Sequence, residues 1–229
     1  MCISAEVSFG LSGTLLGVGS FCVVRALQVD RRLIPLALVP MVFSIQQFCE
    51  GCLWVGLNRA NPGLVRGAGL AYLSFALFFW PVWASLSTLP IEPRKGVRWF
   101  LCGTGVVGAL VGAGLFLPLV LHPDWLTIEV VRHSIYYNTS AVPFLSVIPS
   151  AAWEGVYLAA VAIPFMVSPE RRLFHLGLAL VLSAAVSHIF FRYAGASIWC
   201  FFAAALSLYL SALFLRQGPP AAEPAGSGA

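Results

Sequence analysis

Charged side chains are scarce in this sequence. Only 10% of its 229 residues are charged, 59% are hydrophobic and the mean hydropathy is +0.89, whereas roughly 25% of the residues of a soluble domain are charged. This composition excludes an ordinary soluble protein and predicts a multi-pass membrane protein. The net charge of +4 is too small to indicate nucleic-acid binding, so we expect the lipid bilayer, and no nucleic acid, as a partner.

Other features are also missing. Lys95 is the only lysine, and the preference for arginine is typical of a GC-rich bacterial genome. The first residues, MCISAEVSFGLSG, contain no basic segment and no small-residue cleavage site, so we expect no removable signal peptide. No connection is long enough for a soluble domain, which excludes a built-in nucleotide-driven motor. These features predict a protein of the bacterial cytoplasmic membrane.

Seven apolar segments reach the length of about 20 residues that a helix needs to cross a bilayer. They run from about Ala5 to Leu27, Leu33 to Leu57, Gly67 to Leu89, Trp99 to Leu121, Phe144 to Val167, Leu173 to Tyr193 and Ala196 to Leu215. The sequence therefore predicts an all-α bundle of seven transmembrane helices in one domain, residues 1–216. The tail over residues 217–229 is rich in Gly, Pro and Ala, which predicts disorder.

The basic residues of the loops predict the orientation, because Lys and Arg concentrate on the cytoplasmic side of a membrane protein. The richer side has Arg25, Arg31, Arg32, Arg94, Lys95, Arg98, Arg171, Arg172 and Arg216. The other side has Arg59, Arg66, Arg132 and Arg192. This bias predicts an N-terminus outside and a cytoplasmic C-terminus, which agrees with an odd number of spans.

Polar residues concentrate in the second segment, within the stretch SIQQFCEGCLW. A polar side chain inside a membrane span is costly, so it faces the bundle interior and marks a candidate functional site. Positions three and four apart share one face of a helix, and here that face carries Phe43, Gln46, Gln47, Glu50 and Trp54. We expect Glu50 to act as a ligand or proton carrier, with the two glutamines as hydrogen-bond donors that orient it.

Later segments carry polar groups at a similar depth. With a rise of about 1.5 Å per residue from the outer end of each segment, Glu50 lies about 10 Å deep, Glu154 about 15 Å, His188 about 8 Å and Cys200 about 7 Å. A bundle around them predicts an outward-facing pocket that binds or translocates a small polar solute or ion. The candidate residues are Glu50, Glu154, His188, Gln46, Gln47, Trp54, Trp153, Arg192, Trp199 and Cys200.

An enzyme is the first alternative. Glu50, Glu154 and His188 could bind Zn²⁺ or another divalent metal as a cofactor and so support a hydrolase, although the sequence has no HExxH motif. Cys49 and Cys52 form a CxxC that suits a thiol oxidoreductase. Cysteines in the middle of an apolar helix are more often inert core residues.

A protein without chemistry is the second alternative. In it Glu50, Glu154, His188 and Arg192 form a polar network that fixes the register of the helices, since buried charges are retained only when they are paired. Such a protein would serve as a sensor or as a structural partner in an assembly.

Small residues predict close helix packing. Gly13 with Gly17, and Gly108 with Gly112, have the spacing that lets two helices approach closely in a membrane. The connection from His122 to Pro143 is the longest of the chain, and loops of this length are often lids or binding loops.

Aromatic residues near the ends of the segments predict where the headgroups lie. Trp80 and Trp83 fall toward the cytoplasmic end of the third segment, and the long outer connection contains Trp125, Tyr136 and Tyr137. Tryptophan and tyrosine at such positions are typically interfacial anchors.

Three separated motifs carry a family resemblance: MCISA followed by SFG, QQFCEG with Trp54, and SIWCFFAA near the last segment. Together they resemble a bacterial family of uncharacterised multi-pass membrane proteins, a domain of unknown function, whose chains begin Met-Cys-Phe-Ser-Ala. Here Ile3 stands in place of Phe, and Cys49 and Cys52 replace aliphatic residues, which weakens the redox alternative. The resemblance implies fold and membrane location, and no activity. By position it singles out Cys2, Ser4, Gln46, Gln47, Glu50, Gly51, Trp54, Trp199 and Cys200.

Overall fold

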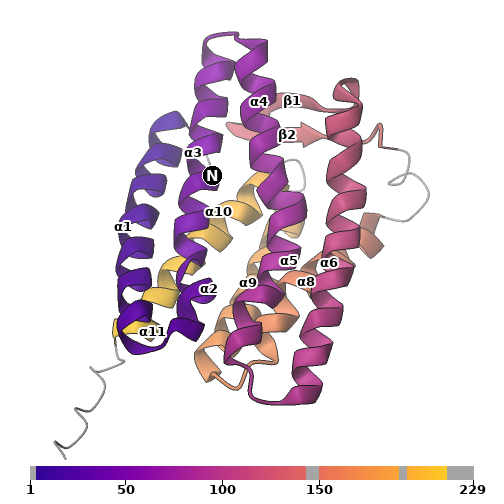
Figure 1. Ribbon diagram of the computed structural model, residues 1–229. Coiled ribbons are helices and arrows are strands. Elements are labelled where there is room, and N and C mark those ends of the chain that lie inside the picture. Colours follow the sequence, from indigo (N-terminus) through magenta and orange to yellow (C-terminus); the bar gives the residue numbers. More distant parts are fainter. Residues whose placement is uncertain (1–3, 143–149, 191–194, 216–229) are drawn as a thin grey trace, which may run out of the picture.

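Long helices account for most of the chain in the computed structural model, which describes residues 4–142, 150–190 and 195–215. Figure 1 shows them side by side as a bundle, with a two-stranded sheet near one end. The α-helices are α1 (Ala5–Val29), α2 (Ile34–Ala37), α3 (Val39–Asn58), α4 (Pro62–Leu73), α5 (Trp80–Thr88), α6 (Lys95–Leu121), α8 (Ser150–Met166), α9 (Arg171–Phe190), α10 (Gly195–Ser207) and α11 (Ser211–Leu215). Short helical turns of other types join them at η1 (Arg31–Leu33), η2 (Ser74–Phe79), η3 (Leu89–Ile91), η4 (Pro123–Trp125) and η6 (Leu208–Leu210).

Six helical stretches of the described chain are long and apolar enough to cross a membrane. They are Ala5–Val29, Arg31–Asn58, Pro62–Ile91, Lys95–Leu121, Arg171–Phe190 and Ser197–Leu215. The predicted helical membrane protein is thus confirmed, and six of the seven expected spans are found as such stretches within the described residues. The predicted fifth segment corresponds to a shorter apolar helix, Ala152–Met166. Residues 143–149, where that segment was expected to begin, and the predicted disordered tail lie outside the described residues.

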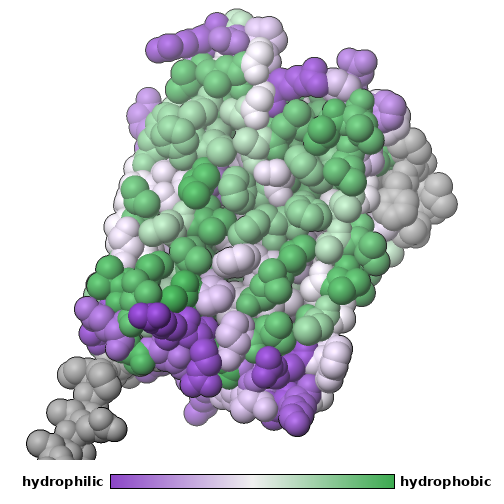
Figure 2. Space-filling model, in the orientation of Figure 1, coloured by the Kyte–Doolittle hydropathy of each residue, from purple (hydrophilic) through white to green (hydrophobic). Residues whose placement is uncertain are grey.

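The surface of the bundle suits a lipid environment. Figure 2 shows hydrophobic side chains over the middle of the visible face and hydrophilic ones gathered at its two ends. Large apolar side chains point outward from several helices, among them Leu110 of α6 and Leu182 of α9. In water such a surface would be an aggregation liability, whereas lipid tails cover it without cost.

Helices α1 and α3 pack closely through small residues. The Ser12 hydroxyl donates to the Ser44 carbonyl at 2.9 Å, and the Ser44 hydroxyl donates to the Ser12 carbonyl at 2.7 Å. A Cβ atom on Gly19 would lie only 2.7 Å from the backbone nitrogen of Met41. Because no other residue fits there without a backbone shift, Gly19 sets the distance between the two helices.

The glycine spacings gave one wrong and one correct prediction. A Cβ on Gly13 or Gly17 would meet nothing within 4 Å among the described residues, so this pair makes no close helix contact. A Cβ on Gly112 would lie 2.8 Å from the carbonyl oxygen of Leu77, and one on Gly108 would clash with the backbone of Pro81. The second pair therefore lets α6 pack closely against the third span, as predicted.

The third span is interrupted by the π-helical segment η2. The Trp80 amide donates to the carbonyl of Phe75, five residues earlier, and Pro81 has no amide hydrogen to continue an α-helical pattern. The hydroxyl of Tyr157 in α8 donates to the Ala76 carbonyl in this segment. Widened turns of this type occur frequently at functional sites, and this one stands directly before the Trp80 side chain.

The connection between α6 and α8, which was predicted as a loop, contains a β-hairpin. Strands β1 (Thr127–Val131) and β2 (Ser134–Asn138) are antiparallel, and Val131 faces Ser134. The two turn residues, Arg132 and His133, have φ angles of 50° and 59°, as a type I′ turn requires. The strands TIEVV and SIYYN are rich in the β-branched and aromatic residues that favour sheets.

The hairpin covers one end of the bundle. Ile135 of β2 is fully buried in a cluster with Trp54 of α3. The Tyr137 ring stacks on Tyr72 of α4, with ring centres 5.2 Å apart and planes within 3° of parallel. The hairpin therefore covers this end of the bundle. Tyr137 packs inside the protein, although it was expected to be an interfacial anchor.

At the opposite end of the bundle, two charged side chains connect segments that are far apart in the chain. Glu92 is nearly fully buried and accepts a hydrogen bond from the Arg94 guanidinium at 2.7 Å. Arg94 also donates to the Val167 carbonyl, just after α8. The hydrogen bond from Arg94 holds the pKa of the Glu92 carboxyl below its usual range. This contact ties the connection between α5 and α6 to the end of α8.

Candidate functional site

The predicted polar face of α3 is buried. Gln46, Gln47 and Glu50 have no exposed surface, and Phe43 and Trp54 are 6% exposed each. The three- and four-residue spacing therefore identified the inward face correctly. Because Glu50 is completely enclosed, the predicted outward opening is not present among the described residues.

Glu50 is held by the last span. The Ser197 hydroxyl donates to Glu50 Oε1 at 2.6 Å, and both side chains are fully buried. Ser197 lies in the first turn of α10, where unpaired backbone amides give the helix a partial positive charge. The fold thus brings a hydroxyl donor and the first turn of the last helix to the carboxylate.

Gln46 connects the same face to the third span. The Trp80 indole nitrogen donates to Gln46 Oε1 at 2.6 Å. The Trp80 ring also stacks on Phe43, with ring centres 3.8 Å apart. The Gln46 Nε2 is buried without a partner at hydrogen-bonding distance among the described residues, and the Cys200 thiol lies beside this amide.

A thiol and a phenol complete this group of polar side chains. The Cys200 thiol lies beside the Tyr72 hydroxyl and the Gln46 amide, with the Glu50 carboxylate nearby. Cys200 and Tyr72 are buried. We use the name polar centre for this group, which consists of Gln46, Glu50, Tyr72, Ser197 and Cys200.

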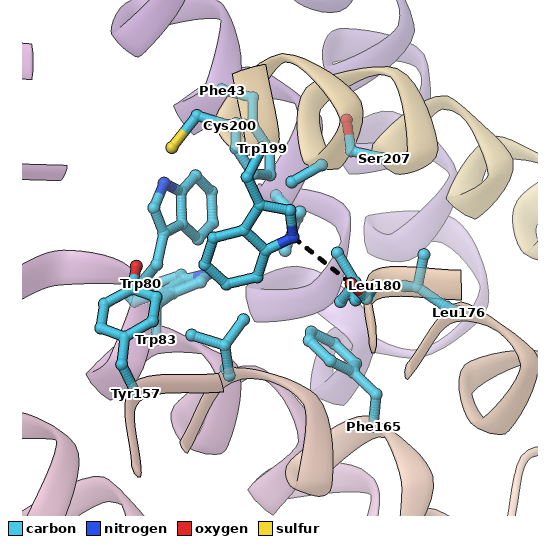
Figure 3. A pocket seen from close by; sticks show the side chains of 14 residues that line it. Phe43, Trp80, Trp83, Tyr157, Phe165, Leu176, Leu180, Trp199, Cys200 and Ser207 are labelled. Atoms are coloured by element: carbon cyan, nitrogen blue, oxygen red, sulfur yellow. Dashed lines mark hydrogen bonds between the residues drawn. The ribbon is translucent and has the colours of Figure 1, made fainter. Parts of the chain in front are cut away.

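An aromatic cavity adjoins the polar centre (Figure 3). Its space for the centres of water molecules is about 40 Å³, and one water needs about 10–15 Å³ by this measure. Trp80 and Cys200 line the cavity and also contact Gln46. The cavity and the polar centre are therefore neighbours with a shared wall. The six aromatic rings around the cavity are those of Phe43, Trp80, Trp83, Tyr157, Phe165 and Trp199.

Two predicted residues form a separate pair. His188 Nδ1 lies 3.0 Å from Glu154 Oε2, and about half of each side chain is exposed. Glu50, by contrast, is fully enclosed. In the described part of the chain no three His, Cys, Asp or Glu side chains gather closely enough to hold a metal ion. The predicted combination of Glu50, Glu154 and His188 is therefore not assembled, and Arg192 lies outside the described residues.

The two cysteines of the CxxC motif are separate thiols. Cys49 and Cys52 are unbridged and partly buried. Cys49 packs into a cluster with Tyr72 and Cys200, whereas Cys52 packs into a different cluster with Trp54. Packing into two different clusters, without a bridge, fits the interpretation of core cysteines better than that of a dithiol pair.

The three predicted tryptophans lie outside the polar centre. The indole nitrogen of Trp54 is buried without a hydrogen-bond partner among the described residues. Trp199 donates to Ser183 Oγ at 3.1 Å and to the Leu180 carbonyl at 3.3 Å, so it ties α10 to α9. Trp153 is half-buried on α8.

Sequence reasoning missed three residues of this region. Ser197 begins the motif SIWC and was the one polar residue there not singled out. Trp80 was expected to be an interfacial anchor, whereas it is 7% exposed and bonded to Gln46. Tyr72 carries no spacing signal, because its partners come from other segments. For Ser197 a signal was available, because it belongs to the same SIWC motif as Trp199 and Cys200.

No curated protein and no solved structure matches the chain. A family model matches residues 1–225 and is described as a family of unknown function. The match includes every residue of the polar centre and confirms the resemblance seen in the three sequence motifs. The chain therefore belongs to this family of unknown function, DUF6629.

Proposed function

We propose that this membrane protein binds and translocates a small solute or ion at the polar centre, with Glu50 as the residue that takes up and releases a proton or cation. The observation that carries the proposal is the shared wall: Trp80 and Cys200 line the cavity and also contact the polar centre. A ligand in the cavity would thus lie next to the group that contains a buried carboxylate.

A purely structural role explains the presence of a carboxylate at position 50 less well than a functional role does. Ser12 and Ser44 already fix the register of α1 and α3 with neutral groups. A carboxylate inside a membrane protein costs several kcal/mol unless it is compensated, and such residues usually belong to ion or proton pathways. Protonation of Glu50 would remove one charge and alter its acceptance of the Ser197 hydrogen bond, which couples the charge of the site to the last span.

Translocation requires the closed centre to open. The hairpin stands over the bundle end through Ile135 and Tyr137, so we assign the outer opening to a movement of this cover. Alternation between a closed and an open state is how transporters expose a central site.

We also propose a topology. The chain crosses a bacterial cytoplasmic membrane seven times, with α8 as part of the fifth span, the N-terminus outside and the C-terminus in the cytoplasm. The excess of basic residues in one set of loops supports the orientation, and the apolar length of α8 supports the additional span.

The test uses purified protein in liposomes that contain a pH-sensitive dye. A potassium diffusion potential drives protons inward, and we expect the wild type to acidify the interior. Glu50→Gln should lose most of this flux. Glu154→Gln is the matched control, because it makes the same chemical change at a half-exposed carboxylate, and it should keep the flux. Equal flux in the wild type and Glu50→Gln would contradict the role given to Glu50.

A further inference from the structure

We infer that the aromatic cavity binds an organic cation with a methylated ammonium group. This inference rests on the proposed binding function and names the class of its ligand. Figure 3 shows the side chains of Trp80, Trp83 and Tyr157 on one side of Trp199 and that of Phe165 on the other. A cation is attracted to the negative face of such rings, and tryptophan gives the strongest attraction.

The polar atoms of these rings are already used elsewhere. Trp80 donates to Gln46, Trp83 to the Pro35 carbonyl and Trp199 to α9. The cavity is therefore lined by aromatic rings and apolar carbons, with almost no free hydrogen-bonding groups among the described residues. A sugar, an amino acid or a phosphate would lose its bonds to water there. A methylated ammonium has few or no N–H groups to satisfy, so it can enter such a cavity.

The charge of the surroundings favours a cation over a neutral ligand of the same shape. None of the described residues that line the cavity is basic or acidic. The carboxylate of Glu50 is near Cys200, which is part of the wall. In a protein interior the field of that carboxylate is screened less than it would be in water, so it reaches the cavity.

The size of the cavity fits a compact head group. Its space of about 40 Å³ for water centres corresponds to a group about 7 Å across once the ~1.4 Å radius of a water molecule is added. A trimethylammonium group is of this kind, whereas a flat ring system or a long chain needs a longer cavity.

The test compares choline with 3,3-dimethyl-1-butanol, the neutral molecule in which carbon replaces the charged nitrogen. Binding of each to full-length protein in lipid nanodiscs is measured by calorimetry. We expect choline to bind about 10-fold tighter than the neutral molecule, which corresponds to about 1.4 kcal/mol of cation–π and charge interaction. Equal binding of the two would show a simple apolar site and overturn the inference, as would the absence of choline binding.

Variants at Trp199 distinguish a loss of the preference for choline from a general loss of stability. Trp199→Phe preserves a ring face and should keep part of the preference for choline, whereas Trp199→Leu should abolish it. Trp99→Leu is the control, because Trp99 is 79% exposed on α6. A general loss of stability would weaken both ligands together, so an unchanged ratio in Trp199→Leu would contradict the proposal.

The two proposals fail in different ways. If Glu50→Gln abolishes proton flux while choline and the neutral molecule bind alike, the role of Glu50 stands and the ligand class is wrong. If choline is preferred while flux does not depend on Glu50, the ligand class stands and the function given to Glu50 is wrong.

Discussion

The hydroxyl of Ser197 connects the second span to the last one through the most deeply buried carboxylate of the described chain. Replacement by alanine leaves one oxygen of that carboxylate without this donor. Hydrogen bonds to charged groups contribute about 1.5–3 kcal/mol, so we expect Ser197→Ala to lower the free energy of unfolding in detergent by that amount. Unfolding by a denaturing detergent measures it.

Ser207→Ala is the matched control for this prediction. Ser207 is also buried on α10, but its hydroxyl donates to the Ala204 carbonyl of the same helix. We expect this change to cost under about 1 kcal/mol. If both alanine variants lost the same stability, the hydrogen bond to Glu50 would contribute no more to the free energy of unfolding than the bond within α10.

At the residue scale, the sequence predicted the two residues that α3 contributes to the polar centre. Gln46 and Glu50 were identified because polar side chains within an apolar segment must face inward. Trp80 and Ser197 were missed because their role depends on contacts between segments far apart in the chain. A serine in an apolar helix most often bonds a carbonyl of its own helix, as Ser207 does, so nothing local distinguishes Ser197.

The contact between α1 and α3 gives a prediction at the scale of elements. Gly19→Ala places a methyl group against the Met41 backbone, and the resulting separation of the helices should cost about 1–3 kcal/mol. Gly17→Ala meets nothing within 4 Å and should be neutral or stabilising by up to about 1 kcal/mol. Thermal unfolding of the two variants tests this, and equal midpoints would contradict the packing described for Gly19.

Apolar length predicted most of the helices, and spacing predicted their partners less well. The pair Gly13 and Gly17 has the same spacing as Gly108 and Gly112, yet within the described chain only the second pair touches another helix. Spacing defines a face, whereas tertiary packing decides what covers it. The hairpin was missed because its strands are short, although their β-branched and aromatic residues were a usable signal.

At the scale of the whole molecule, acid should loosen the end that contains Glu92. Arg94 lowers the pKa of Glu92 in the folded protein, so this pair contributes stability above the unfolded value of about 4.3. That contribution is lost as the pH falls from there through the folded pKa. Glu92→Gln should therefore lose stability at neutral pH and lack this part of the acid dependence. Parallel pH dependence in both proteins would contradict it.

Reporter fusions test the proposed topology. Alkaline phosphatase is active only outside the cytoplasm, so a fusion after Ala60, between α3 and α4, should be active. A fusion after Leu215 should be inactive, and green fluorescent protein placed there should fluoresce. An active phosphatase at Leu215 would mean an even number of spans between the two sites, and hence a bundle without the seventh crossing.

The bond between Ser197 and Glu50 also has a consequence for the order in which the protein is made. The two residues are 147 positions apart, and a ribosome adds about 5–20 residues per second, so roughly 7–30 s separate their synthesis. During that time α3 has entered the insertion machinery while α10 does not yet exist. The nascent chain must shelter an acidic side chain by other means, either as the neutral acid or within a hydrated part of that machinery, until the last helix arrives.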